Sequence, residues 1–422
     1  MRQAISQFFE RHVPLLWMAA FLVLAMKGNS DRPPDNTILF AVAAAGIVYH
    51  LTYSAELLWG LVSRYRAIFS TALVLCLAIL VAECRVQFAG LAPAHALPAQ
   101  VALLLCLPSL AVFLLEPRRM TWAVGLFCAV SAWHIVMMPV EAITGEKVTW
   151  HQLFLMQRDA GPFKFRASGL AIAPFYFPGL MLPLFYLAWG PVFHKRVFPE
   201  LEISHRLMLA LPLIWLIPVT CVQSRSAFFG VLVASLLLVI LSSRSRHVLL
   251  WIGAMLVAGL GAVVYWYLFT EGKSGFDLRA AYLKFYVDKS LDWKWIATGH
   301  GFFFDPAMVA PGYQPLDHSH NDFVQILYSW GLTTLIAYLA FWAALLKLIV
   351  SRFASQREYW PLAAVLAELP NMQTDLGFHH FEKAMFLIVL TSLCVVFAEW
   401  DSRRKPATSP RTADTPSAAV AA

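Results

Sequence analysis

Residues 321–350 read NDFVQILYSWGLTTLIAYLAFWAALLKLIV, a run in which Asp322 and Lys347 are the only charged side chains. The run can cross a bilayer, because a membrane-spanning helix needs about 20 mostly apolar residues. The whole chain of 422 residues has the same character, with 59% hydrophobic and 14% charged residues. A soluble domain carries roughly 25% charged residues. The composition therefore excludes a water-solvated globular protein, and the apolar content excludes a disordered one.

Similar hydrophobic runs recur along the chain and predict an all-α polytopic integral membrane protein. A β-barrel does not fit, because its strands would alternate apolar and polar side chains. Residues 1–405 are expected to form one transmembrane domain and residues 406–422, rich in Ala, Ser, Thr and Pro, a disordered tail. On a template of 17–25 residues we expect about twelve spans, near residues 14–30, 38–62, 67–84, 100–116, 121–140, 169–193, 207–223, 226–242, 247–270, 321–350, 359–376 and 384–400.

Basic residues between these runs predict the orientation. Every connector after an even-numbered span carries a cluster of Lys and Arg, from Arg64 and Arg66 to Arg403 and Arg404. The short connectors on that side hold 16 such residues, against five on the other. By the positive-inside rule, both termini and the tail are cytoplasmic. The net charge of +7 is then a feature of membrane topology, and we expect no nucleic-acid partner.

The segment 271–320 is a long connector on the side opposite the basic clusters, which we call the outward side. It ends in a stretch rich in His, Asp and Asn. Its end, with the start of the next run, reads DHSHND over residues 317–322. We expect Asp317 or Ser319 to cap the following helix. A histidine in the first turn would meet the positive end of the helix dipole, which favours the neutral imidazole. His320 is thus a candidate general base, and an interfacial histidine that only donates or accepts hydrogen bonds is the alternative.

Three outward arginines are candidate phosphate ligands. Arg225 lies in the short turn QSRS, Arg166 begins the stretch RASG, and Arg279 stands early in segment 271–320. A guanidinium stays charged and binds phosphate oxygens through two parallel hydrogen bonds. If the three converge, they suit a lipid-linked phosphate, whereas snorkelling toward lipid headgroups is the alternative for each alone. Asp375 is expected to orient His320 or to neutralise an arginine.

The sequence predicts neither a metal nor another cofactor. His318 and His320 are conceivable ligands together with His300 or the pair His379 and His380, but no HExxH motif or paired acidic motif accompanies them. A P-loop is also absent from the sequence.

Four short motifs carry a resemblance, in this order along the chain: RASG at 166–169, SRS at 224–226, GHG at 299–301 and HSHND at 318–322. In their order, spacing and common outer side they resemble the bacterial O-antigen ligase and polymerase superfamily. The resemblance covers roughly residues 160–400, and the first five spans match by hydropathy alone.

The resemblance implies a GT-C-like fold in the bacterial inner membrane and an inverting, metal-independent glycosyltransferase that faces the periplasm. The donor would be a glycan linked to undecaprenyl pyrophosphate. His320 would deprotonate the acceptor hydroxyl, and Arg225 and Arg279 would hold the donor pyrophosphate. Substrate-binding roles are expected for Arg166, Asn321, His318 and Asp375.

The acceptor divides this superfamily. A ligase transfers the glycan to lipid A–core oligosaccharide, a polymerase extends a second lipid-linked chain, and a protein O-oligosaccharyltransferase modifies exported proteins. Protein O-oligosaccharyltransferases of the superfamily often carry a sizeable C-terminal extension, whereas only residues 401–422 follow the last predicted span. We therefore expect a ligase, with the polymerase as the next alternative and with membrane lipids as its surroundings. A transporter of lipid-linked oligosaccharides is the alternative from another class. The sequence shows no internal repeat of the kind that transporters often carry.

Overall fold

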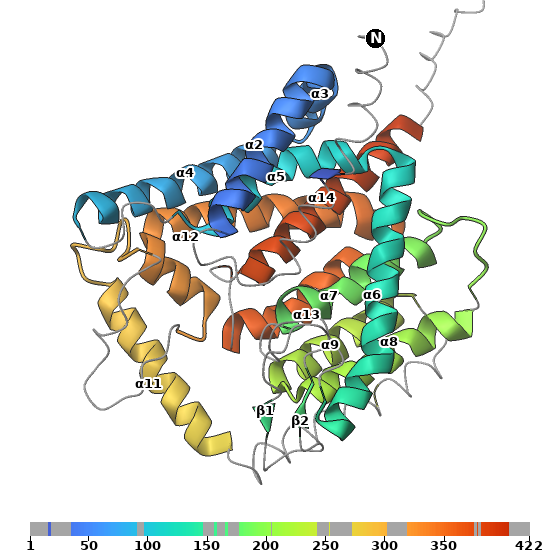
Figure 1. Ribbon diagram of the computed structural model, residues 1–422. Coiled ribbons are helices and arrows are strands. Elements are labelled where there is room, and N and C mark those ends of the chain that lie inside the picture. The colour runs from blue at the N-terminus through green and yellow to red at the C-terminus, as the bar shows by residue number, and fades with distance from the viewer. Residues whose placement is uncertain are drawn as a thin grey trace, which may run out of the picture.

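Apolar runs form helices throughout the part of the chain that the computed structural model describes (Figure 1). The described residues are 16–17, 35–90, 97–146, 156–157, 165–167, 177–203, 205–242, 253, 272–301, 319–374, 378 and 381–404. The elements are α2 (Asp35–Tyr53), α3 (Ala55–Arg64), α4 (Arg66–Phe88), α5 (Ala99–Leu114), α6 (Pro117–Thr144), β1 (Met156–Gln157), β2 (Phe165–Arg166), α7 (Phe177–Phe193), α8 (His205–Val222), α9 (Arg225–Ser242), α11 (Gly272–Ser290), α12 (Asp322–Leu348), α13 (Trp360–Thr374) and α14 (Phe381–Arg404).

Four helices among the described residues are long and apolar enough to cross a membrane. They are Arg66–Phe88, Pro117–Thr144, Asp322–Gln356 and Lys383–Arg404, and a bent pair, α2 with α3, brings the number to five if it counts as one span. The apolar helices α5, α7 and α9 are shorter. The predicted spans 14–30 and 247–270 lie almost wholly outside the described residues. These helices indicate a membrane protein, and the expected number of twelve spans stays a prediction.

A sharp bend interrupts the predicted span over residues 38–62. α2 ends at Tyr53, and α3 leaves it at an angle of 106°. Ser54, between the two helices, has a non-helical backbone (φ −146°), and its hydroxyl lies 3.1 Å from Nδ1 of His50. A serine that bonds to a neighbour in this way competes with the helical ladder. Hydropathy cannot detect the bend, because both halves are apolar.

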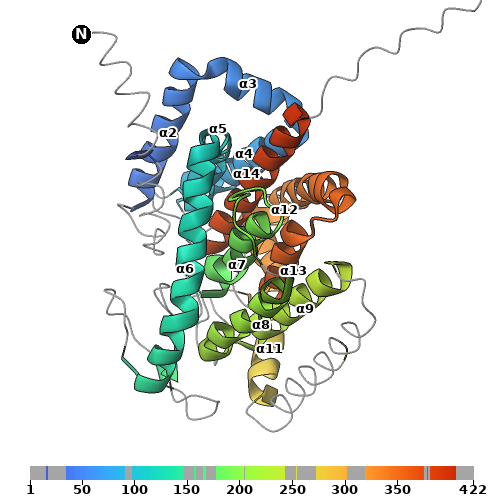
Figure 2. The ribbon, with the colours of Figure 1, turned by 90° about the vertical axis from the view of Figure 1, so that its right-hand side faces the viewer.

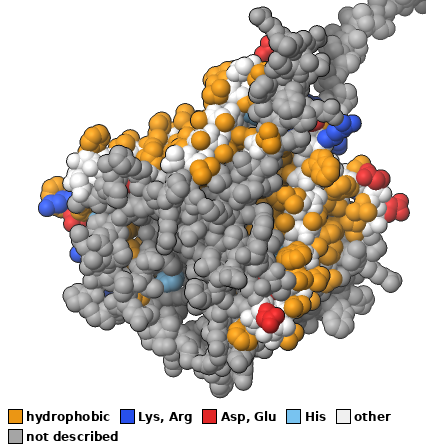
Figure 3. Space-filling view, viewed as in Figure 1, with side chains coloured by type: hydrophobic (Ala, Val, Ile, Leu, Met, Phe, Trp, Pro, Cys, Tyr) orange, Lys and Arg blue, Asp and Glu red, His pale blue; other side chains and the backbone are white. Residues whose placement is uncertain are grey.

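Burial separates central helices from peripheral ones. α5 and α14 pack against each other and bury nearly all of their side chains. α6 packs against α7 and α8 and stands along one side of them (Figure 2). α2, α4 and α6 instead expose many apolar side chains, which form bands over α4 and α6 (Figure 3). Apolar patches of this extent are rare on soluble monomers, and they suit helices that face lipid.

Ionic contacts gather connectors that the sequence places on the cytoplasmic side. Arg196, between α7 and α8, pairs with Glu358, which precedes α13, and with Asp401 near the end of α14. Arg64, at the end of α3, lies 2.5 Å from Glu399 of α14. These contacts join connectors that follow predicted spans 2, 6, 10 and 12. They agree with the predicted alternation of the connectors.

The opposite ends of the helices meet one another as well. Arg85, near the end of α4, donates a hydrogen bond to the carbonyl of Lys294 at 2.8 Å. Gln100, at the start of α5, donates to the carbonyl of Phe378 at 3.3 Å. In Figure 1, α11 lies at the lower left and the β1–β2 pair lies at the bottom, both away from the last turn of α14 at the upper right. The elements that carry Arg279 and Arg166 are therefore remote from that turn.

We expect replacement of Arg196 by methionine to destabilise the protein strongly. The side chains of Arg196 and Glu358 are each 9% exposed and that of Asp401 is 12% exposed, so the substitution leaves two carboxylates buried without their cation. Breaking a buried ion pair in this way costs about 3–5 kcal/mol. The measurement is the thermal unfolding midpoint of the purified protein in detergent. Arg403→Met is the matched control, since that side chain is 54% exposed and its pair contributes about 1 kcal/mol or less. Equal midpoints for the two variants would contradict the expectation.

Candidate active site

The first feature of the candidate site is a break in α12. Gly331 has φ 80° and ψ 178°, which interrupts the helix between an outer part, Asp322–Trp330, and an inner part that begins at Leu332. Glycine is required here, because a Cβ atom would overlap the backbone of Ala297 and Thr298 and because a positive φ strains other residues. The chain thus brings the middle of the segment 271–320 directly against the helix.

Residues 296–301 fill this break by backbone hydrogen bonds. The amides of His300 and Gly301 donate to the carbonyls of Tyr328 and Ser329, at 2.8 and 2.7 Å. The amide of Leu332 donates to the carbonyl of Ile296 at 2.6 Å. A broken helix at membrane depth is tolerated where such partners satisfy the freed backbone groups. The segment 296–301 therefore replaces part of the helical ladder of α12.

Side chains hold the inserted segment from two sides. The imidazole of His300 stacks between the rings of Trp295 and Tyr328, with centroid distances of 4.9 and 4.5 Å. Arg85 donates to the hydroxyl of Thr298, and its guanidinium lies 5.0 Å from the centre of the Trp295 ring. Burial lowers the pKa of the His300 imidazole. His300 therefore has a packing role, and no group of three or more His, Cys, Asp and Glu side chains that could hold a metal is found among the described residues.

His320 lies in a strained turn directly before α12. Its φ is 56°, which is uncommon for a residue with a side chain, and its side chain is half-buried. The turn is held on both sides. The buried amide of Ser319 donates to Oε1 of Gln325 at 2.7 Å, and the hydroxyl of Ser319 donates to the carbonyl of Asn321 at 2.8 Å. Strained residues that their surroundings hold in place cluster at functional sites.

The expected capping of this helix was wrong. Asn321 is the N-cap, and its side chain accepts a hydrogen bond from the amide of Val324 at 3.1 Å. The first helical residue is Asp322, so Ser319 lies too far upstream to cap the helix, and Asp317 lies outside the described residues. His320 consequently precedes the N-cap instead of standing in the first turn. It still lies at the positive end of the helix dipole.

Two buried carboxylates beside the break were missed from the sequence. Asp322 accepts hydrogen bonds from the hydroxyl of Tyr338, at 2.6 Å, and from the amide of Phe378. Glu83 of α4 accepts from the indole N–H of Trp330 at 2.7 Å. Both carboxylates are fully buried. The available signal was their charge within or next to apolar runs, because ionisable residues in such runs are rare and often functional.

We expect Asp322→Asn to destabilise the outer part of α12. Both described partners of the Asp322 carboxylate are donors, and an asparagine presents one N–H₂ group in place of an acceptor oxygen. A buried donor left without its acceptor costs about 1–3 kcal/mol. Thermal unfolding in detergent measures the loss, and Tyr338→Phe, which removes one of the donors, is the milder control. An unchanged unfolding midpoint for Asp322→Asn would show that the carboxylate is dispensable.

Arg279 lies on the helix that packs against the outer part of α12. The prediction of an outward loop over 271–320 missed this helix, α11, because its composition is mixed and not apolar. α11 contacts α12 through Tyr286, whose ring lies edge-on to Tyr328 with a centroid distance of 4.7 Å. Positions 279, 282 and 286 share one face at helical spacing, and Tyr282 and Tyr286 are buried. Position 279 is thus on the α12-facing side of α11.

Arg166 and Arg225 belong to a second group of contacts. β2, which contains Arg166, pairs with β1, and the next residue, Ala167, donates its amide to the carbonyl of Cys221 at 2.9 Å. Gln223 has φ 56° and donates from its side chain to the carbonyl of Phe165 at 3.0 Å. Because α9 begins at Arg225, these bonds bring the backbone of both arginines to the α8–α9 turn.

The backbones of Arg166 and Arg225 therefore come together at one turn, His320 and Asn321 lie at the start of α12, and Arg279 lies on α11, which packs against α12. His318 and Asp375 lie outside the described residues. Glu368 of α13 pairs with Lys383 of α14.

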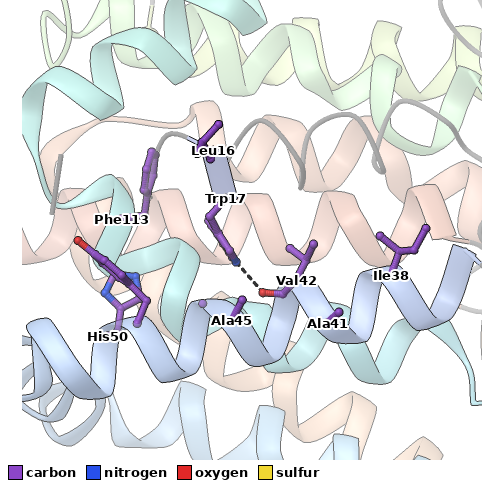
Figure 4. A pocket seen from close by; sticks show the side chains of 10 residues that line it. Leu16, Trp17, Ile38, Ala41, Val42, Ala45, His50 and Phe113 are labelled. Carbon is purple, nitrogen blue, oxygen red and sulfur yellow. Dashed lines mark hydrogen bonds between the residues drawn. The ribbon is translucent and has the colours of Figure 1, made fainter. Parts of the chain in front are cut away.

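A cavity of about 350 Å³ lies elsewhere, between residues 16–17, α2 and α5 (Figure 4). Trp17 reaches into it and donates to the carbonyl of Val42 at 2.7 Å, and His50 stands at one end. The described residues that line this cavity include neither Lys nor Arg, and none of the predicted site residues is among them. The cavity is thus apart from the described members of the candidate site.

Comparison with known proteins does not assign the chain to a family. No family model matches this chain, and no curated protein matches it either.

Proposed function

We propose that this protein is a glycosyltransferase that transfers a glycan from undecaprenyl pyrophosphate to lipid A–core oligosaccharide, as an O-antigen ligase does. The observation that carries the proposal is the turn at His320. A half-buried histidine with a left-handed backbone is fixed by Ser319, Asn321 and Gln325 at the positive end of α12. These bonds fix the backbone of the turn, and the positive end of a helix dipole favours the neutral imidazole that a general base requires. The four motifs named above supply the substrate class.

In the proposed reaction, His320 takes the proton of the acceptor hydroxyl as its oxygen attacks the anomeric carbon. The bond from that carbon to the pyrophosphate oxygen breaks, so that the configuration inverts. Negative charge develops on the leaving pyrophosphate. Arg225 and Arg279 would stabilise that charge, because preorganised cations lower the barrier where charge builds up. Arg166, His318, Asn321 and Asp375 would contact the substrates or support these groups.

Several placements support this assignment. His320, the α11 helix of Arg279 and the α8–α9 turn of Arg225 stem from connectors on the same predicted side, which would be the periplasmic face of the inner membrane. We also propose that residues 1–405 form one transmembrane domain with a GT-C-like fold and that this domain contains the active site. The broken helix α12 does not favour the transporter alternative. Its freed backbone groups bond to residues 296–301, so they are not offered to a transported ion or sugar.

The test uses purified full-length protein in detergent with a lipid-linked glycan donor and lipid A–core acceptor. Sugar-modified lipid A–core is the expected product. A donor that instead grows in length would assign a polymerase, and transfer to neither acceptor would overturn the proposal. Activity that persists in chelator is expected, because two arginines take the role of a metal.

We expect Arg225→Lys to lower the transfer rate more than it weakens donor binding. A lysine keeps the charge but loses the two parallel hydrogen bonds that a guanidinium offers to a phosphate. Removal of one stabilising donor at a developing charge costs about a hundred- to a thousandfold in turnover. Steady-state kinetics with varied donor separate kcat from KM. The matched control is Arg244→Lys, in a short connector on the opposite predicted side, and a similar loss in both variants would contradict a phosphate-binding role for Arg225.

A further inference from the structure

α11 presents a second face that the packing against α12 leaves uncovered. Its buried face carries Tyr282, Tyr286 and Ser290. On another side, Leu283 and Leu291 are exposed, with the half-buried Val287 between them at helical spacing. The apolar stripe continues past the helix into Trp293, which is 81% exposed. The second half of α11 therefore carries an apolar stripe that its contacts with α12 do not cover.

α4 carries a matching stripe that marks a lipid-facing surface. Leu73, Leu77, Val81 and Phe88 are exposed at helical spacing along this candidate span, and Phe88 at its end is 92% exposed. The helix of 23 residues is about 35 Å long at 1.5 Å per residue, somewhat more than the hydrocarbon thickness of about 30 Å. Phe88 therefore stands at the boundary between hydrocarbon and headgroups.

Contacts of Arg85 join the exposed apolar stripe of α4 to that of α11 near the end of α4. Arg85, one turn before the end of α4, donates to the carbonyl of Lys294 and stacks on Trp295. These contacts fix the turn 291–295 at the depth of the last turn of α4. In Figure 3, the apolar row along α4 reaches the left end of the molecule, where basic side chains appear beside it.

Charge on this surface suits phospholipid headgroups. Lys284 is exposed next to the apolar stripe of α11, Lys294 is exposed next to Trp293, and Lys289 is exposed on another side of the helix, near Phe285. The carboxylates of Asp288 and Asp292 are exposed on the same segment. The ammonium groups of Lys289 and Lys294 each lie 5.9 Å from the centre of a neighbouring aromatic ring. Tryptophan and lysine are typical of the membrane interface, where an apolar body meets hydrocarbon and a polar group meets phosphate.

We propose that α11 and the turn 291–294 form a membrane-surface helix, embedded in the headgroup layer by Leu283, Leu291 and Trp293. The occupant of this face is phospholipid. Lys284 and Lys294 bind lipid phosphates, and the contacts of Arg85 couple the depth of α11 to that of α4. Helices of this kind lie in the plane of the interface with their apolar side toward the acyl chains. The inference does not depend on the proposed enzymatic function.

The test measures the depth of single nitroxide labels in nanodiscs that hold one copy of the full chain. Cys84, which is exposed, and Cys128, which is half-buried, are first replaced by serine, while the other four cysteines are buried. Labels are then placed by Trp293→Cys, by Leu283→Cys and, as a control, by Glu200→Cys in the exposed connector between α7 and α8. Power saturation compares collisions with oxygen, which concentrates in lipid, and with a water-soluble nickel complex.

Labels at positions 283 and 293 are expected to collide several-fold less often with the nickel complex, and more often with oxygen, than the label at position 200. Equal nickel accessibility at 293 and 200 would overturn the proposal. Protection that arises only in nanodiscs with two copies, together with spin–spin broadening, would also overturn it, because the occupant would then be a second copy of the chain. All three substituted side chains are exposed, and a monodisperse elution profile confirms that each variant is folded.

Discussion

His320→Ala is expected to lower glycan transfer by about a hundred- to ten-thousandfold, the usual contribution of a general base. The imidazole is the group proposed to take the acceptor proton, and alanine offers no replacement. The substitution should leave the fold intact, because the bonds that hold the turn come from Ser319, Asn321 and Gln325. Alanine also tolerates the half-buried position, although its φ of 56° is a modest strain for it.

The measurement is the initial rate of transfer with saturating donor, alongside the thermal unfolding midpoint of the same preparation. His194→Ala is the matched control, since that histidine is also half-buried in a connector but lies beside Arg196, at the other end of the molecule. The control should transfer glycan at the original rate. If His320→Ala retained full transfer, His320 would not be the base, while the ligase assignment could still be judged from the product.

Gly331→Val is expected to destabilise the protein by more than about 4 kcal/mol, a loss that single substitutions reach only through a specific structural conflict. Two conflicts coincide here. The backbone of Gly331 has φ 80°, which a β-branched residue avoids. A side chain there would also overlap the backbone of Ala297 and Thr298 and push segment 296–301 out of the break.

Thermal unfolding in detergent and the yield of monodisperse protein report this loss. The matched control is Gly60→Ala in α3, where a Cβ atom meets nothing within 4 Å and where alanine is the better helix former. The control should unfold at the original temperature or slightly above it. A Gly331→Val protein as stable as the control would mean that the break in α12 is not needed for the fold.

Hydropathy alone predicts the positions of the long helices. The predicted runs 67–84, 121–140 and 384–400 correspond to α4, α6 and α14 within a few residues. It cannot predict the bend at Ser54 or the break at Gly331, because both interruptions lie between segments that are equally apolar. The break in particular depends on hydrogen bonds to residues 296–301, which are about thirty positions away and which no local pattern reveals.

The candidate site was predictable in its residue types more than in its geometry. His320 was proposed from its position before an apolar helix. In the structure it lies in a strained turn that precedes the N-cap of that helix. The cap was assigned wrongly because Asp, Ser and Asn are all good caps, and only the true start of the helix at Asp322 selects Asn321. The sequence did not single out Asp322 or Glu83 as buried acceptors, because their donors are distant in the chain. Asp322 accepts from Tyr338, 16 residues later, and Glu83 of α4 accepts from Trp330 of α12.

The filled break in α12 also sets an order of events during biosynthesis. Residues 296–301 precede α12 in the chain, so they leave the ribosome before the helix that they complete. Had the order been reversed, the freed backbone groups around Gly331 would enter lipid without partners, at a cost of several kcal/mol for each group. Because the inserted segment comes first, the partners are available when α12 arrives in the membrane. We therefore expect the outer part of α12 to dock only after the segment before it has been translocated.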